Sequence, residues 1–305
     1  MIQLAPREFV CSPEASAARF TTAEAEAYTH WLATHHYENF QVVSFLLPKR
    51  LHQDFYNVYA YCRWADDLGD EMGSPEESLR LLAWWRKQLA AMYAGEAAHP
   101  VFVALRGTVT RYAIPEEPFA DLIRAFEQDQ TVTRYTTWAD VYAYCRYSAN
   151  PVGRLLLYLC GYSDAERQRL SDATCTALQL ANFWQDVAVD LEKDRVYIPL
   201  EVLARHAYRL EDLYARRMTP AFATAMREIV ARARELFVEG LPLSSMVDRR
   251  LAVDIDLFSR GGMRVLDKIA AQGYDVLSRR PAISKAERVW LLLGSLARVA
   301  MLRTA

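Results

Sequence analysis

The stretch Y-A-Y-C-R-W-A-D-D-L-G-D-E, residues 59–71, gives the clearest indication of the fold. Tyr59, Arg63, Asp66 and Asp70 recur there at intervals of three and four residues. An α-helix would place all four side chains on one face, because residues with this spacing lie above one another along the helix. We therefore expect a helix with an acidic end, set among apolar residues.

A second stretch, Q-L-A-N-F-W-Q-D-V-A-V-D at residues 179–190, follows nearly the same rule. Its polar side chains Gln179, Asn182, Asp186 and Asp190 also share one helical face. The sequence thus predicts two separate helices that each carry an aspartate pair four residues apart.

Helical periodicity extends over most of the chain, and alternating strand patterns are hard to find. We expect an all-α fold in one domain, residues 1–305, in which only residues 1–20 could be irregular. Proline and glycine mark the predicted helix breaks. These breaks fall at Pro48, Gly73–Pro75, Gly95–Pro100, Ile114–Pro115, Asn150–Pro151, Pro199, Pro220, Gly240–Pro242 and Arg280–Pro281.

The two aspartate pairs are electrostatically costly unless a cation offsets them. Like charges at ~4 Å repel by about 1 kcal/mol in water and by about 4 kcal/mol at an effective dielectric near 20. Magnesium binds one or two carboxylates together with phosphate oxygens and water, which two sparse pairs can provide. A single D-D-x-x-D is more often a solvated helix end, but the second pair favours a metal-diphosphate site.

Other classes of function lack their sequence signatures. A di-iron helical bundle needs two E-x-x-H elements, and only Glu96-Ala-Ala-His99 qualifies. The chain has neither a P-loop nor a G-x-G-x-x-G dinucleotide motif. Its formal net charge of -2 and pI near 6.3 leave no basic surplus for nucleic acid, so we expect no nucleic-acid partner.

Cysteine usage and hydropathy predict a cytoplasmic location. The five cysteines are scattered and include no C-x-x-C pair, and charged residues interrupt the N-terminus where a secretory signal would be apolar. No uncharged run approaches the ~18 residues of a membrane-spanning helix. The segment 285–303 mixes basic residues with Trp290, Leu291, Leu292 and Leu293. We expect it to pack on the core, with peripheral contact at the inner membrane face as the alternative.

Taken together, these motifs resemble the squalene/phytoene synthase family over about residues 36–274. The supporting blocks are H-Y-E-N-F-Q-V-V-S-F-L-L-P from His36, the two aspartate motifs, Y-C-R-Y-S-A-N-P-V-G from Tyr144, and the D-R-V-Y-I-P segment that ends at Pro199. The resemblance implies an isoprenoid synthase helical bundle with a central hydrophobic cavity. It also implies Mg²⁺ as cofactor and a prenyl diphosphate as substrate.

Roles for individual residues follow from the resemblance. The implied metal ligands are Asp66, Asp70, Asn182, Asp186 and Asp190, and the aspartates act in catalysis with Tyr59 and Asn150. The implied diphosphate-binding residues are Arg63, Gln179, Asn182, Arg195, Tyr197 and Tyr274. The implied cavity residues are His36, Asn39, Phe40, Tyr144 and Phe183, although a lone histidine beside aromatic rings is usually structural. Asn150 would hold the water that quenches a cation, with helix capping before Pro151 as the alternative.

The sequence departs from many relatives at Glu38, where they carry a basic residue, and at Gln185, where they carry arginine. Together with E-N-F, A-N-P-V-G and N-F-W-Q-D, these departures resemble the bacterial hydroxysqualene synthase branch. That branch implies conversion of presqualene diphosphate to hydroxysqualene in hopanoid and squalene biosynthesis, without NADPH. It also implies functional coupling to a presqualene diphosphate synthase and to a downstream reductase.

Two groups of alternatives stay open at this stage. Presqualene diphosphate, squalene, dehydrosqualene and phytoene synthases share the family's motifs. An inactive helical partner protein of the same fold is the non-enzyme alternative, although the four intact aspartates argue against it.

Overall fold

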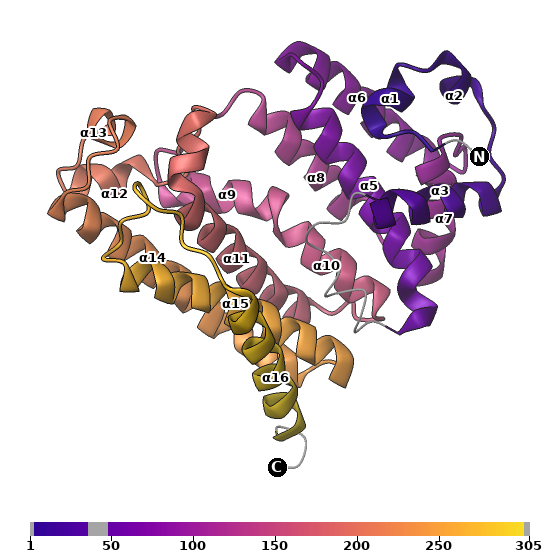
Figure 1. Ribbon diagram of the computed structural model, residues 1–305. Coiled ribbons are helices and arrows are strands. Elements are labelled where there is room, and N and C mark those ends of the chain that lie inside the picture. Colours follow the sequence, from indigo (N-terminus) through magenta and orange to yellow (C-terminus); the bar gives the residue numbers. More distant parts are fainter. Residues whose placement is uncertain (1–2, 36–47, 302–305) are drawn as a thin grey trace. The chain divides into compact units, whose positions relative to one another are not determined.

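The computed structural model describes residues 3–35 and 48–301, which are almost entirely helices and connecting turns (Figure 1). Within these ranges the chain forms no β-strand, and an isolated bridge joins Arg134 to Val196. The predicted all-α fold is confirmed. Backbone contacts group the chain into two compact units. The single domain that we expected stays a prediction.

The first unit comprises residues 1–131 and 151–163. Its helices are α1 (Pro6–Val10), α2 (Pro13–Ala17), α3 (Thr22–His35), the 3-10 helix η1 (Lys49–Leu51), α5 (His52–Asp70), α6 (Pro75–Tyr93), α7 (Pro100–Tyr112), α8 (Glu117–Asp129) and nearly all of α10 (Asn150–Leu159). Two short helices therefore form within the first 20 residues.

The second unit comprises residues 132–150 and 164–305. Its helices are α9 (Trp138–Ser148), α11 (Ala165–Glu192), α12 (Leu200–Arg205), α13 (Leu210–Tyr214), α14 (Pro220–Gly240), the 3-10 helix η2 (Leu241–Ser245), α15 (Arg249–Ala271) and α16 (Lys285–Met301).

Several helices begin at predicted breaks, with proline in the first turn and a capping side chain before it. Pro75 and Pro220 each occupy the first turn, where a missing N–H costs nothing, and Ser74 and Thr219 accept hydrogen bonds from backbone N–H groups of those turns. Proline at the predicted breaks thus marks helix starts. Within the described residues, no helix has the length and apolar character needed to span a membrane.

The core of the first unit is built around the aromatic side chains of α5 and α6. The Trp64 and Trp85 rings stack with centroids 5.0 Å apart, and the edge of His99 meets the Trp64 ring at 4.4 Å. Burial lowers the pKa of His99 to about 3, so this histidine is a neutral core residue. These contacts fix α5 one turn before its acidic end.

The core of the second unit is the packing of α11 against α14 and α15. Glycines allow close approach at two of its contacts. A Cβ atom at Gly240 would lie 2.1 Å from Thr174 Oγ1, and one at Gly262 would lie 2.1 Å from Phe237 Cζ. The first contact brings the end of α14 close to α11, and the second brings α15 close to α14. The last two turns of the 28-residue helix α11 carry the second aspartate pair.

Candidate active site

The acidic end of α5 is partly neutralised by an arginine of the same helix. The Arg63 Nη2 atom lies 2.5 Å from Asp67 Oδ1, and the Nη1 atom lies 3.5 Å from Asp66 Oδ2. The same guanidinium lies 3.4 Å from Glu71 Oε1. Asp70 is exposed in the last turn. One arginine therefore serves three acids, and the predicted stripe does bring Arg63 and Asp66 together.

Asp67 belongs to this end, and the stripe argument missed it. Its side chain is buried, and burial raises its pKa to about 7. Arg63 lowers the pKa, whereas Glu71 and Asp66 raise it again. The i, i+4 spacing from Arg63 to Asp67 is a sequence signal that could have indicated this ion pair.

The acidic end of α11 holds the second aspartate pair. Asp186 and Asp190 are each partly exposed, one helical turn apart. Burial, and then the Asp186 charge, raises the pKa of Asp190 to about 7, although Arg195 and Lys193 act to lower it. The unfavourable contact that the spacing predicts between these two carboxylates is therefore present.

A cation that the sequence analysis missed lies on Asp186. The Arg280 guanidinium binds this carboxylate with two hydrogen bonds, Nε donating to Oδ1 and Nη2 donating to Oδ2 at 3.1 Å. Beside it, the Gln185 side-chain amide donates to the Pro281 carbonyl at 2.5 Å. A guanidinium thus reaches Asp186 even though the residue before it is glutamine. No local pattern could indicate a contact across 94 positions.

The D-R-V-Y-I-P segment, residues 194–199, is tied to two parts of the second unit. The backbone N–H of Arg195 donates to the Asp190 carbonyl at 2.9 Å, and the N–H of Val196 donates to the Thr133 carbonyl at 2.9 Å. These bonds hold Arg195 directly after the acidic end of α11, and its role in binding diphosphate stays a prediction.

Tyr197 lies in an aromatic cluster with two of the predicted cavity residues. Its ring stacks on Phe183 with centroids 3.8 Å apart and an interplanar angle of 4°, and the Tyr144 ring lies 5.8 Å away. Tyr135, which the sequence analysis did not select, stacks on Tyr197 at 5.6 Å. All four are buried. The adjacent cavity of about 10 Å³, lined by Phe183, Asp190 and Tyr197 among others, holds no more than about one water.

The predicted amide residues have different surroundings. Asn182 is exposed and Gln179 partly exposed, both on the face of α11 that leads to Asp186. Asn150 is buried at the first residue of α10, and its Oδ1 atom accepts a hydrogen bond from Thr176 Oγ1 at 2.9 Å. The helix break predicted at Asn150 is present, since α9 ends at Ser148.

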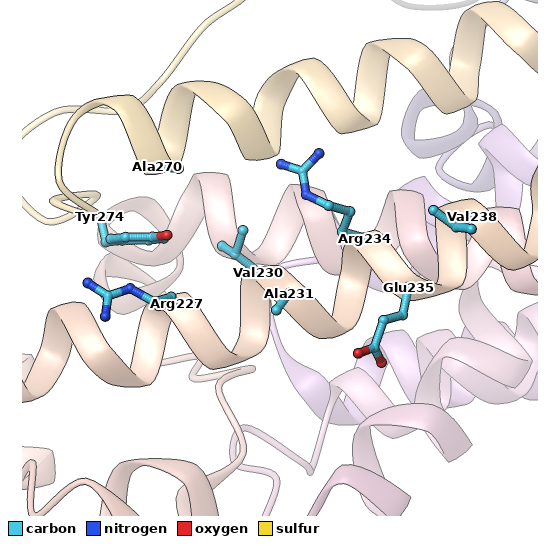
Figure 2. A pocket seen from close by; sticks show the side chains of 8 residues that line it. All are labelled: Arg227, Val230, Ala231, Arg234, Glu235, Val238, Ala270 and Tyr274. Atoms are coloured by element: carbon cyan, nitrogen blue, oxygen red, sulfur yellow. The ribbon is translucent and has the colours of Figure 1, made fainter.

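Tyr274 lies beside Arg227, which is not one of the predicted diphosphate-binding residues (Figure 2). The guanidinium carbon of Arg227 is 5.4 Å from the centre of its ring, and both side chains line a groove between α14 and α15. Asp190, Arg195 and Tyr197 line another cavity. The described contacts therefore do not place Tyr274 with the second aspartate pair.

The remaining predictions concern α5 and the segment before it. Tyr59 is partly exposed. Burial acts to lower the pKa of the Arg63 guanidinium, whereas Asp67, Asp66 and, more weakly, Tyr59 raise it. His36, Asn39 and Phe40, together with Glu38, lie outside the described residues.

Comparison with known proteins identifies the family to which these motifs belong. The family model for squalene/phytoene synthase matches residues 33–287, which is most of the chain. The chain belongs to the squalene/phytoene synthase family. Members of this family are enzymes that use prenyl diphosphates, and they use divalent metal to ionise them. The resemblance stated from the motifs is confirmed.

Three similar proteins carry names that state three different products. The chain is 34% identical to a phytoene synthase of Thermus thermophilus, over 84% of this chain and 87% of that protein. It is 33% identical to a hydroxysqualene synthase of Rhodopseudomonas palustris, over 86% and 89%. The crystal structure of squalene synthase HpnC from Alicyclobacillus acidocaldarius superposes with a TM-score of 0.80 at 44% identity, over 83% and 95%.

The carboxylates at each acidic end are of the kind that can bind a metal ion together with a diphosphate. Within residues 3–35 and 48–301, no group of three or more histidine, cysteine, aspartate or glutamate side chains is arranged to hold a metal alone. Magnesium does not require such a group, because one or two carboxylates with phosphate oxygens and water complete its octahedron. Asp186 and Asp190 supply carboxylate oxygens, the ligands that Mg²⁺ prefers. Burial, and then the Asp186 charge, disfavours the ionised form of Asp190, and a bound cation would offset that penalty.

Proposed function

We propose that this enzyme converts presqualene diphosphate and water into hydroxysqualene and diphosphate, with Mg²⁺, in bacterial squalene and hopanoid biosynthesis. The 33% identity to the Rhodopseudomonas hydroxysqualene synthase and the 32% identity to a hydroxysqualene synthase of Sinorhizobium fredii support this product, whereas the 44% identity to squalene synthase HpnC supports the wider group of squalene-forming enzymes. The motifs E-N-F, A-N-P-V-G and N-F-W-Q-D support the same branch.

The carboxylates at the C-terminal ends of α5 and α11 carry the proposal that a diphosphate is ionised. A helix C-terminus carries partial negative charge, so acids there are disfavoured by ~0.3–1 kcal/mol each. Asp67 and Asp190 both have a pKa raised to about 7, with burial as the main cause. Negative charge gathered in such places suits cation binding, which would stabilise the folded enzyme in its loaded form.

The proposed division of roles follows the charges. Asp66, Asp70, Asp186, Asp190 and Asn182 would hold Mg²⁺, which when bound supplies positive charge to the departing diphosphate. Arg63 and Arg195 would donate hydrogen bonds to its oxygens, and we add Arg280 to this group because it already binds a carboxylate in bidentate fashion. Gln179, Tyr197 and Tyr274 stay proposed contacts from the resemblance.

Ionisation breaks the carbon–oxygen bond, and diphosphate leaves with the bonding electron pair. The carbocation rearranges and is then attacked by water, which forms a new carbon–oxygen bond and loses a proton to solvent or to the departing diphosphate. Aromatic faces stabilise a nearby cation without capturing it. Tyr59, Tyr144 and Phe183, with His36, Asn39 and Phe40, are the proposed lining, and Asn150 is the proposed water-positioning residue.

The alternative products share the ionisation step and differ in the fate of the carbocation. The 34% identity to a phytoene synthase keeps condensation of two prenyl diphosphates as the second candidate. Presqualene diphosphate, squalene and dehydrosqualene synthases remain alternatives, as does an inactive partner protein of the same fold. Under the proposal, an enzyme that makes presqualene diphosphate acts before this one and a reductase acts after it.

One assay separates these candidates. Purified protein is incubated with presqualene diphosphate and Mg²⁺, with and without NADPH, in water labelled with heavy oxygen. We expect labelled hydroxysqualene in both cases, and Asn150→Ala should shift the products toward eliminated hydrocarbons. Squalene that forms only with NADPH, or an unlabelled alcohol, would overturn the proposal. Efficient condensation of farnesyl or geranylgeranyl diphosphate would favour an alternative product, and no turnover of any prenyl diphosphate would favour the inactive partner protein.

A further inference from the structure

Helix α16 exposes an apolar face that no other described element covers. Five large apolar side chains form this α16 apolar face: Val289, Trp290, Leu293, Leu296 and Met301. Trp290 is 74% exposed and Leu293 52% exposed. Val289, Leu293 and Leu296 follow one another at intervals of four and three residues, and Trp290 and Met301 lie along the edge of the same side of the helix. Single exposed apolar residues are ordinary, but a continuous stripe with tryptophan marks a contact surface.

The opposite side of α16 is firmly held on α15. Ser295 and Val299 are buried, and Arg298 Nη2 lies 2.8 Å from Asp256 Oδ2. Near the start of the helix, the Glu287 carboxylate lies 2.7 Å from Arg264 Nη2 and 2.9 Å from Lys268 Nζ. The terminal segment therefore packs as expected from the sequence, and it still presents the α16 apolar face.

A groove of about 530 Å³ adjoins this face, and it is rich in arginine. Trp290 and Leu291 form one side, and Asp267 and Glu287 are its acids. Its four arginines, which define the arginine groove, are Arg234, Arg260, Arg264 and Arg298. Each of these guanidinium groups is paired with a carboxylate: Arg234 with Asp267, Arg264 with Glu287, and both Arg260 and Arg298 with Asp256. Lys268 also pairs with Glu287, so five cations face three carboxylates and leave a local surplus of two positive charges, although the whole chain has a formal net charge of -2.

The basic character continues into the neighbouring groove between α14 and α15, which has a volume of about 510 Å³ (Figure 2). Arg234 lines both grooves. Figure 2 shows Arg227 beside Tyr274 at one end of this groove and Arg234 further along α14, with Val230 between them, while Glu235 points away from α15. The Glu235 carboxylate pairs with Arg232 at 2.9 Å.

We propose that the α16 apolar face and the arginine groove together form a docking surface for an anionic lipid bilayer. A helix lying in the membrane interface buries apolar side chains on one side and places basic residues against anionic headgroups. Trp290 belongs to both parts, at the border where tryptophan is favoured in membrane interfaces.

Charge distinguishes this partner from a second copy of the chain. In a two-fold dimer the same patch meets itself, so the arginine surplus of one copy would approach that of the other. Like charges at such a contact are unfavourable. Anionic headgroups instead neutralise the groove while the acyl region accepts Val289, Trp290 and Leu293.

The test measures co-sedimentation of the full chain with vesicles, without substrate or metal. Vesicles of phosphatidylcholine alone are compared with vesicles that also contain phosphatidylglycerol. We expect tighter binding to the anionic vesicles, weakened by salt because exposed charges are screened. The double variant Trp290→Ser, Leu293→Ser should lose about tenfold or more in binding, since it removes two large apolar groups from the interface. Arg260→Gln should lose about fivefold, or about 1 kcal/mol.

Matched controls separate docking from general effects. Met218→Ser removes an exposed apolar side chain that belongs to neither groove, and Arg80→Gln removes an exposed arginine of α6, so both should bind like the unaltered chain. The double serine variant should keep its thermal midpoint and its turnover in detergent micelles, which separates this proposal from the proposed function. Equal binding of that variant and the unaltered chain, or equal binding to both vesicles, would refute the proposal. A dimer that the serine substitutions dissociate, without vesicle binding, would assign the surface to a second copy.

Discussion

The acidic ends of α5 and α11 share one spacing but obtain their cations differently. On α5, Arg63 lies in the same helix as the acids and binds Asp67 and Asp66. On α11, the cation on Asp186 is Arg280, which comes from the segment between α15 and α16. The first end is thus balanced by its own helix, whereas the second depends on a distant segment folding back onto α11.

This difference separates two tasks that the acids perform. Asp67 is buried and paired, so its ion pair contributes to the structure of α5. Asp186 and Asp190 are more accessible, and the Arg280 guanidinium on Asp186 is exposed, so a ligand could replace or share it. A cation at the second end therefore competes with, or joins, a guanidinium that is already in place.

The largest expected effect tests whether both ends serve catalysis despite this difference. Asp70→Asn and Asp186→Asn should each lower kcat/KM with magnesium by about a hundredfold or more, the loss typical of removing one electrostatic contact to a transition state, ~2.7 kcal/mol. The fold should be retained, because neither side chain is buried. Steady-state kinetics with a thermal melt of each variant provides the measurement.

Asp172→Asn is the matched control, because it changes an acid of α11 several turns before the motif. It should retain near-normal turnover. Near-normal turnover of Asp186→Asn would remove the second end from the site, and the same result for Asp70→Asn would remove the first.

Asp254 extends the comparison to an acid without any cation. It is fully buried on α15, and neither of its carboxylate oxygens has a hydrogen-bond partner among the described residues. Burial, and then the Asp248 charge, raises its pKa from 3.8 to about 8. The folded state therefore binds the proton more tightly than the unfolded state. The stability that results is complete below about pH 4 and is lost as the pH rises through about 8.

Asp254→Asn keeps the shape of the neutral acid and cannot ionise. Its free energy of unfolding should exceed that of the unaltered chain by at least ~2 kcal/mol at pH 8, with little difference at pH 4. Asp256→Asn, two residues on, should be destabilising instead, since it breaks the ion pair with Arg298. Urea unfolding at several pH values measures both. An unchanged pH profile in Asp254→Asn would show that this acid is not neutral in the folded protein.

The spacing of residues along the sequence predicted the features that depend on neighbouring residues. The helix starts at Pro75 and Pro220, the two aspartate pairs and the place of Arg195 after Asp190 all follow from residues close in sequence. Arg280 on Asp186 could not be predicted, because it depends on how α15 and α16 direct the chain between them. The ring contact of Tyr274 with Arg227 depends on packing of the same kind.

The smallest expected effect tests the comparison most directly, because it contrasts Arg63→Gln with Arg280→Gln. Without Arg63, the buried Asp67 carboxylate loses the group that most lowers its pKa, so the pKa should rise further and the fold should lose ~1–2 kcal/mol at neutral pH. Without Arg280, Asp186 remains accessible to water, and an exposed ion pair contributes only ~0–1 kcal/mol. Urea midpoints at fixed protein concentration measure the difference, with Arg80→Gln as the control for loss of an exposed arginine.

The two variants should become equally stable at acid pH, where Asp67 is protonated in both. Equal destabilisation by both substitutions at neutral pH would contradict the distinction between a cation that supports α5 and a cation that is available to a ligand at α11.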